Sequence, residues 1–126
     1  FGTATTFDVV SQKGEYLGGA ISPGVQLSLE ALFKSAAMLP RVDMAEPEYA
    51  IGKSTIESIH SGTVYGFVGM IDGMVLRIQE ELQQEVQVIG TGGIVDLIAS
   101  KTKTIDIIDP FLTLEGLRII HRRNQG

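Results

Sequence analysis

The N-terminal segment Gly2-Thr3-Ala4-Thr5-Thr6 holds residue types that can bind phosphate. Small residues let a backbone approach a ligand closely, so that its N–H groups can point at phosphate oxygens. Threonine hydroxyls add further donors. Three threonines in a short run also favour a β-strand for purely structural reasons. These residues alone leave both interpretations open.

A second segment, Val88-Ile89-Gly90-Thr91-Gly92-Gly93, has the pattern of a strand followed by a glycine turn and a helix start. Such a turn frees a helix N-terminus to face an anion or a flat ring system. The segment has neither the Gly-Lys-Ser/Thr of a P-loop nor the spacing of the dinucleotide fingerprint. A plain connection between a strand and a helix explains it equally well.

The third feature is a helix start at Ser54-Thr55-Ile56-Glu57. This is a capping-box pattern, with Ser54 as the N-cap and Glu57 at the third helical position. The spare hydroxyl of Thr55 beside a helix N-terminus is a ready anion site, and Lys53 adds positive charge. The alternative is a cap with a structural role alone.

The sequence offers little support for metal binding or for catalysis by a nucleophile. The chain has no cysteine, which excludes disulfides, thiolate metal sites and thiol nucleophiles. His60 and His121 have no partner at a metal-ligand spacing. Five aspartates could act as a base or a magnesium ligand, but no spacing singles one out: Asp8, Asp72, Asp96, Asp106 and Asp109.

Composition sets broader limits on partners. The chain has 126 residues, with 10 Lys+Arg against 15 Asp+Glu and a net charge of −5, which fits one domain. The acidic balance argues against a nucleic-acid partner. No apolar run is long enough to span a bilayer, which argues against a membrane partner. The chain begins with Phe1 rather than Met, and we interpret it as a piece of a longer protein.

The N-terminal half of the chain predicts a hairpin and a helix. Residues 3–10 and 15–21 have strand composition and are joined by a polar turn. A helix follows, with Ser22 as its N-cap and Pro23 in its first turn, and Pro40 ends it. Residues 41–50 have no clear period, so we expect a surface loop there.

The rest of the chain predicts helices alternating with short strands. A helical pattern runs from residue 55 to about 82, and its glycines lie on one stripe, where either the same chain or a second copy could pack closely. We then expect strands at 85–89 and 104–108 and helices at 94–100 and 114–123. The last helix should have Thr113 as its N-cap and turn Leu114, Leu117 and Ile120 inward. This order is typical of an α/β (α+β) fold around a central sheet.

Six blocks, in order along nearly the whole chain, resemble the C-terminal half of the type III pantothenate kinases. That family belongs to the superfamily of acetate kinase, sugar kinases, Hsp70 and actin. The resemblance implies that residues 1–126 form a ribonuclease-H-like ATPase domain, a mixed sheet flanked by helices. The six blocks are Phe1-Gly2-Thr3-Ala4-Thr5-Thr6-Phe7-Asp8, Gly18-Gly19-Ala20-Ile21-Ser22-Pro23-Gly24, Ala36-Ala37-Met38-Leu39-Pro40, Ile51-Gly52-Lys53-Ser54-Thr55, Thr91-Gly92-Gly93 and Asp109-Pro110-Phe111-Leu112-Thr113-Leu114-Glu115-Gly116-Leu117.

The resemblance also implies an activity, the ATP-dependent phosphorylation of pantothenate to 4'-phosphopantothenate, the first step of coenzyme A biosynthesis. By position, Gly2, Thr3, Gly92 and Gly93 would bind ATP, and Thr55 would contact pantothenate. Members of the family are cytoplasmic homodimers that use Mg²⁺ and a monovalent cation, K⁺ or NH₄⁺.

Several motifs of the family have no counterpart in this sequence. The general base lies in a Gly-x-Asp-Arg block and one phosphate loop reads Asp-Val-Gly-Asn-Thr, and neither is present. The aspartate that binds the monovalent cation would come immediately before Phe1. We therefore expect no catalytic residue and no metal ligand in this chain, and no activity from it without the N-terminal half. The alternatives are a nucleotide-binding regulatory accessory protein of the same fold, a superfamily kinase with another acceptor such as a sugar, and a half that serves only as a scaffold.

Overall fold

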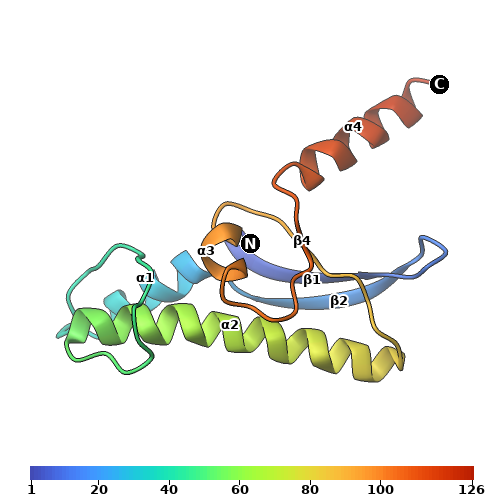
Figure 1. Ribbon diagram of the computed structural model, residues 1–126. Helices are drawn as coiled ribbons and strands as arrows, with labels where there is room; N and C mark the ends of the chain where they lie inside the picture. Colours follow the sequence, from blue (N-terminus) through green and yellow to red (C-terminus); the bar gives the residue numbers. More distant parts are fainter. The chain divides into compact units, whose positions relative to one another are not determined.

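The computed structural model describes residues 1–126 and divides into two compact units, residues 1–67 and 68–126. The elements follow the chain in the order β1, β2, α1, α2, β3, α3, β4 and α4 (Figure 1). The alternation of strands and helices confirms the predicted α/β class. The strands form two separate two-stranded sheets, β1 with β2 and β3 with β4, in place of one mixed sheet.

The first unit opens with the predicted hairpin. Strands β1 (Ala4–Val10) and β2 (Tyr16–Pro23) pair antiparallel, with Thr6 opposite Ile21. The register shifts between Val9 and Val10, opposite the first residues of β2, where Gly18 has a φ of +114°. One face of β1 is turned to the interior, and Thr5 on that face is 3% exposed.

Helix α1 (Val25–Ser35) begins later and ends earlier than predicted. Ser22 and Pro23 still belong to β2, where Pro23 lies opposite Ala4, so the prediction that they start the helix is wrong. A proline is tolerated at the end of an edge strand because it need not donate to the ladder. The N-cap is instead Gly24, and α1 buries Val25 and Leu29.

Helix α2 (Thr55–Leu82) runs unbroken through its four glycines. Its first part belongs to the first unit and the remainder to the second. A Cβ atom at any glycine of the stripe would meet nothing within 4 Å: Gly62, Gly66, Gly69 and Gly73. The chain itself therefore does not pack closely along the stripe.

The second unit places a short helix between two parallel strands. Strands β3 (Ile89–Gly90) and β4 (Ile107–Ile108) pair in parallel, and α3 (Val95–Ala99) lies between them in the chain. Val95 and Ile98 are buried. The Asp72 carboxylate of α2 accepts hydrogen bonds from the Lys103 N–H at 3.1 Å and the Thr104 hydroxyl at 2.8 Å, which fixes the loop before β4.

The last helix, α4 (Leu112–Asn124), buries none of its residues. Its N-cap is Phe111 without a side-chain hydrogen bond, so Thr113 is not the cap that the sequence predicted. Leu114, Leu117 and Ile120 are 63%, 57% and 57% exposed, so the prediction that they point inward is wrong for this chain. None of the helices combines the length and the apolar character that a membrane span requires.

Candidate functional site

The predicted phosphate segment lies against the start of α1. The Gly24 N–H donates a hydrogen bond to the Thr3 carbonyl at 2.9 Å. A Cβ atom on Gly24 would come within 2.2 Å of the Gly2 carbonyl oxygen and 2.4 Å of that of Thr3. Only a glycine at position 24 therefore lets the chain pass this close to Gly2 and Thr3 without displacement.

The same region leaves several donors unused. Thr3 is exposed and its hydroxyl makes no hydrogen bond within the protein. Helix α1 has no side-chain cap and no acidic residue in its first turn, so no side chain satisfies its first N–H groups. An uncapped helix start beside a free hydroxyl suits an anion electrostatically.

The predicted glycine turn is present in the second unit. Gly92 has a φ of +116°, in the left-handed region that favours glycine, and its carbonyl accepts a hydrogen bond from the Val95 N–H at 3.4 Å. Gly93 is exposed, and a Cβ atom there would meet nothing within 4 Å. The backbone at Gly93 is thus open to solvent on its Cα side.

The start of α2 has the predicted Ser54 cap, but the Glu57 side chain bonds to a different N–H than in a standard capping box. The Ser54 hydroxyl accepts a hydrogen bond from the Glu57 N–H at 3.2 Å. The Glu57 carboxylate accepts one at 2.7 Å from the N–H of Lys53, where a standard capping box would use the N–H of Ser54. Thr55 is exposed and its hydroxyl makes no hydrogen bond, so it is free to contact a ligand.

A segment that we call the strap, residues 41–53, leads to this helix start. It contains the predicted surface loop and has no regular structure. Three side chains of α2 hold its backbone carbonyls: Ser58 to Gly52 at 3.4 Å, His60 to Asp43 at 2.8 Å and Ser61 to Ala50 at 2.5 Å.

The other end of the strap is fixed to α1. The Arg41 guanidinium donates to both carboxylate oxygens of Glu30, at 2.8 and 2.7 Å, and lies 5.6 Å from the centre of the Phe33 ring. The hydrogen bond from Arg41 lowers the pKa of Glu30. Both side chains are largely exposed, so we expect this pair to contribute little to stability.

Titratable side chains near the hairpin form a small cluster. The Asp8 carboxylate accepts hydrogen bonds from the Thr6 hydroxyl at 3.2 Å and the Tyr16 hydroxyl at 3.1 Å. The hydrogen bond to Asp8 raises the pKa of Tyr16. No three His, Asp or Glu side chains of the chain are grouped so as to hold a metal ion.

The structure also identifies residues that the sequence patterns did not single out for a role. Gly24 and Gly52 permit close approaches of backbone, and His60 and Ser61 hold the strap. A glycine just before each helix start was the available signal, together with the polar residues in the first two turns of α2. Gly2, Thr3 and Thr55 belong to the first unit, and Gly92 and Gly93 to the second.

The chain is an α/β protein in which an exposed glycine- and threonine-rich segment lies beside a helix start that no side chain caps. Residues 1–77 match the family model of the type III pantothenate kinases, and the chain belongs to that family.

Curated relatives named type III pantothenate kinase match the whole chain. The protein of Myxococcus xanthus is 58% identical over 126 residues, which are 100% of this chain and 49% of the relative. The proteins of Anaeromyxobacter sp. Fw109-5 and Geobacter sp. M21 are 54% and 55% identical over 125 residues, which are 99% of this chain and 49% of each relative. The chain thus spans about half the length of the curated relatives it matches.

A solved structure from Campylobacter jejuni, described as a conserved Baf family transcriptional activator, resembles the fold. It has a TM-score of 0.67 and 21% sequence identity, and the match covers 98% of this chain and 55% of that one. At this identity the likeness concerns the fold alone.

Proposed function

We propose that this chain is the C-terminal half of a kinase that phosphorylates pantothenate with ATP, giving 4'-phosphopantothenate in the first step of coenzyme A biosynthesis. The observation that carries the proposal is the 58% identity to a type III pantothenate kinase over all 126 residues. The relatives carry about as many residues again, and in the proposal that further half supplies the general base. It also supplies a second phosphate loop and the aspartate for K⁺ or NH₄⁺.

In this proposal Gly2 and Thr3 bind the phosphates of ATP. The exposed Thr3 hydroxyl and the start of α1, which no side chain caps, support that role because both offer hydrogen-bond donors. Gly92 and Gly93 contact the adenosine part, and the open backbone at Gly93 supports a close approach there. Mg²⁺ would enter with the ATP phosphates, since the chain has no carboxylate group arranged to hold it alone.

Thr55 contacts pantothenate in this proposal. The residue stands at the first position of α2 with an exposed, unbonded hydroxyl, and Lys53 beside it makes no ion pair. We propose that the pantothenate carboxylate lies at this helix end, where the partial positive charge of the helix favours an anion.

The phosphoryl transfer requires little covalent chemistry from this half of the protein. The terminal hydroxyl oxygen of pantothenate attacks the γ-phosphorus of ATP, the bond to the β-γ bridging oxygen breaks, and ADP leaves. The hydroxyl proton passes to the base of the upstream half. Phosphoryl transfer depends mainly on positioning and on charge stabilisation, which suits a half with free donors and no nucleophile.

The finer architecture is part of the proposal. Residues 1–126 would form a ribonuclease-H-like domain in which the strands join a mixed sheet once the upstream half is present. A homodimer in the cytoplasm is the expected state, and the uncovered glycine stripe of α2 leaves room for a close contact with a second copy.

The substitution Thr55→Ala tests the substrate assignment in a protein of the relatives' full length. Loss of one hydroxyl contact should raise the KM for pantothenate about fivefold to tenfold and leave the KM for ATP within about twofold. ATP turnover measured with pantothenate and with a panel of sugars gives both constants and the acceptor class. Thr113→Ala, which removes another exposed hydroxyl, from α4, is the matched control.

Two results would count against the proposal. Turnover with a sugar but not with pantothenate would assign a different acceptor. A rise in the KM for ATP alone in Thr55→Ala would place Thr55 at the nucleotide and remove it from the pantothenate site.

A further inference from the structure

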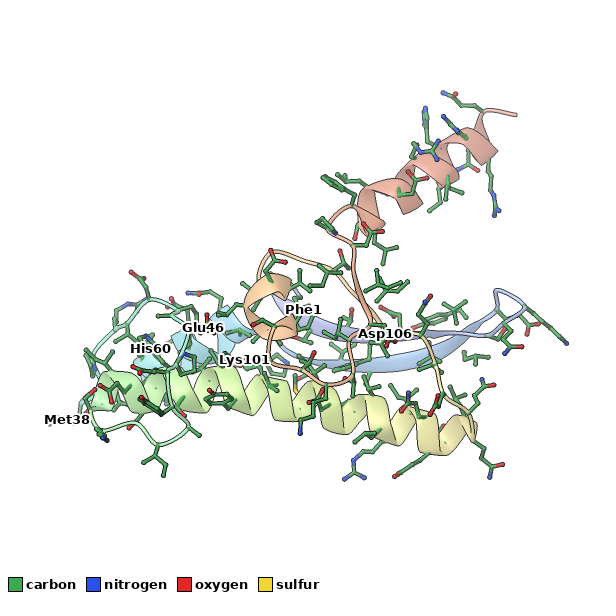
Figure 2. The ribbon with its side chains drawn as sticks, in the orientation of Figure 1. Phe1, Met38, Glu46, His60, Lys101 and Asp106 are labelled. Atoms are coloured by element: carbon green, nitrogen blue, oxygen red, sulfur yellow. The ribbon has the colours of Figure 1, made fainter.

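The strap is packed directly on the backbone of α2. A Cβ atom on Gly52 would lie 2.4 Å from the Ser58 nitrogen and 2.7 Å from the Ser58 Cα. Figure 1 shows residues 41–53 curving around the first turns of α2, and Figure 2 labels Glu46 and His60 at that end of the helix. The strap is therefore in contact with the turn that carries Thr55.

His60 makes the tether that reaches farthest back along the strap. Its Nε2 lies 2.8 Å from the Asp43 carbonyl oxygen, 17 residues away in sequence. A carbonyl oxygen only accepts, so Nε2 must carry a hydrogen, as it does in one neutral tautomer and in the cation. Ser61, 6% exposed, adds a second tether by donating to the Ala50 carbonyl at 2.5 Å.

Both ends of the strap are thus fixed inside one unit. Arg41 attaches its beginning to Glu30 of α1, and the Lys53 N–H attaches its end to Glu57 of α2. Between these points, the side chains of Ser58, His60 and Ser61 contact backbone carbonyls of the strap, and His60 holds the part farthest from α2 in the sequence. Fixing a mobile segment before a ligand arrives saves the entropy that ordering it on binding would cost.

We infer that His60 is a positioning residue for the acceptor substrate. Through Asp43 it holds the strap on α2, and the held strap fixes Lys53 and Thr55 in the arrangement that receives pantothenate. The inference rests on the proposed function for the identity of the substrate, whereas the tether itself rests on the contacts above. His60 lies in the second turn of α2 and need not touch the substrate to act in this way.

The test compares His60→Leu with His60→Gln in a protein of the relatives' full length. Leucine fills similar space without a donor, and the glutamine amide can still donate to a carbonyl. We expect His60→Leu to raise the KM for pantothenate about threefold to tenfold, with kcat and the KM for ATP within about twofold. His60→Gln should return the KM to within about twofold of the unsubstituted protein.

Limited trypsin digestion gives a readout that does not depend on activity. Trypsin cleaves after arginine and lysine, and the strap begins with Arg41 and ends with Lys53. A loosened strap should be cut at these positions about threefold to tenfold faster in His60→Leu, with no change in His60→Gln. Should His60→Leu fail to fold, Ser61→Ala removes the neighbouring tether with the loss of a single oxygen and should accelerate cleavage in the same way.

Each result tests one part of the inference about His60. Unchanged cleavage and an unchanged KM in His60→Leu would overturn the inference, as would equal effects of leucine and glutamine. Faster cleavage with an unchanged KM would leave the tether in place and overturn its role in binding. If the unsubstituted protein does not phosphorylate pantothenate, the proposed function fails, and the role in pantothenate binding fails with it, while cleavage still decides whether His60 holds the strap.

Discussion

Helices α1 and α2 begin in opposite ways within the same unit. Helix α1 starts at a glycine with no side-chain cap and no acidic residue in its first turn. Helix α2 starts with the Ser54 cap, has Glu57 in its first turn, and has the strap bonded to its side chains. The first start is held by backbone contact and by the buried Val25, with no side-chain hydrogen bond, and the second is held by side-chain hydrogen bonds.

In the proposed function, this difference separates two kinds of ligand site. The uncapped start of α1 keeps its N–H groups for a ligand that brings its own negative charge, such as a phosphate. At the capped start of α2, one N–H already donates a hydrogen bond to Ser54. The Glu57 carboxylate there repels an anion. The Thr55 hydroxyl and the Lys53 ammonium must then supply most of the attraction for a carboxylate there.

The largest expected effect is at the start of α1. Gly24 has φ −74° and ψ 168°, which any residue can adopt, so only the lack of space forbids a side chain. Gly24→Ala would force a Cβ atom to 2.2 Å from the Gly2 carbonyl oxygen, and we expect a loss of about 3 kcal/mol in the free energy of unfolding. Denaturant titration followed by circular dichroism measures it.

Gly62→Ala is the control for that substitution. Its Cβ atom would meet nothing within 4 Å, and alanine favours a helix interior, so stability should rise by as much as about 1 kcal/mol. If Gly24→Ala were as well tolerated as Gly62→Ala, α1 would not rest on Gly2 and Thr3 as described.

A smaller effect is expected from removing the cap of α2. Ser54→Ala leaves the Glu57 N–H without its acceptor and should reduce the free energy of unfolding by about 1 kcal/mol. Thr113→Ala should change it by less than about 0.5 kcal/mol, because Thr113 forms no cap in α4. Equal losses of unfolding free energy in the two variants would show that the Ser54 cap does not stabilise α2.

Local patterns predicted these two helix starts unequally. The Ser54 and Glu57 pattern is complete within four residues, and the structure confirms Ser54 as the cap. Ser22 and Pro23 match a helix start just as well, but they pair with Thr5 and Ala4 of β1. Partners 17 and 19 residues away are not visible in a pattern of a few neighbouring residues. The hairpin was predictable because the strand composition of each strand and the polar turn between them are visible locally, whereas the residue at which β2 ends is not.

Long-range burial was the least predictable property. The spacing of Leu114, Leu117 and Ile120 indicates an apolar helix face, and the pattern is real, yet all three side chains are exposed. Periodicity shows which face of a helix can be buried, whereas a partner surface decides whether it is. The same limit applies to the candidate site: Thr3 and Thr55 could be named from the sequence, but the roles of Gly24 and His60 depend on contacts that only the fold creates.

The smallest effect is expected from a substitution that removes the negative charge at the start of α2 and so makes it more like the start of α1. Glu57→Gln keeps an oxygen to accept the Lys53 N–H bond and removes the negative charge. Its cost in stability should be below about 0.5 kcal/mol, because the side chain is exposed. If the pantothenate carboxylate lies at this helix start, the KM for pantothenate should fall about twofold at low salt, and the gain should shrink as salt screens the charge. Glu81→Gln, the same change at the far end of α2, is the control and should leave the KM for pantothenate unaltered. If the KM for pantothenate of Glu57→Gln stays the same or rises at low salt, the pantothenate carboxylate lies elsewhere.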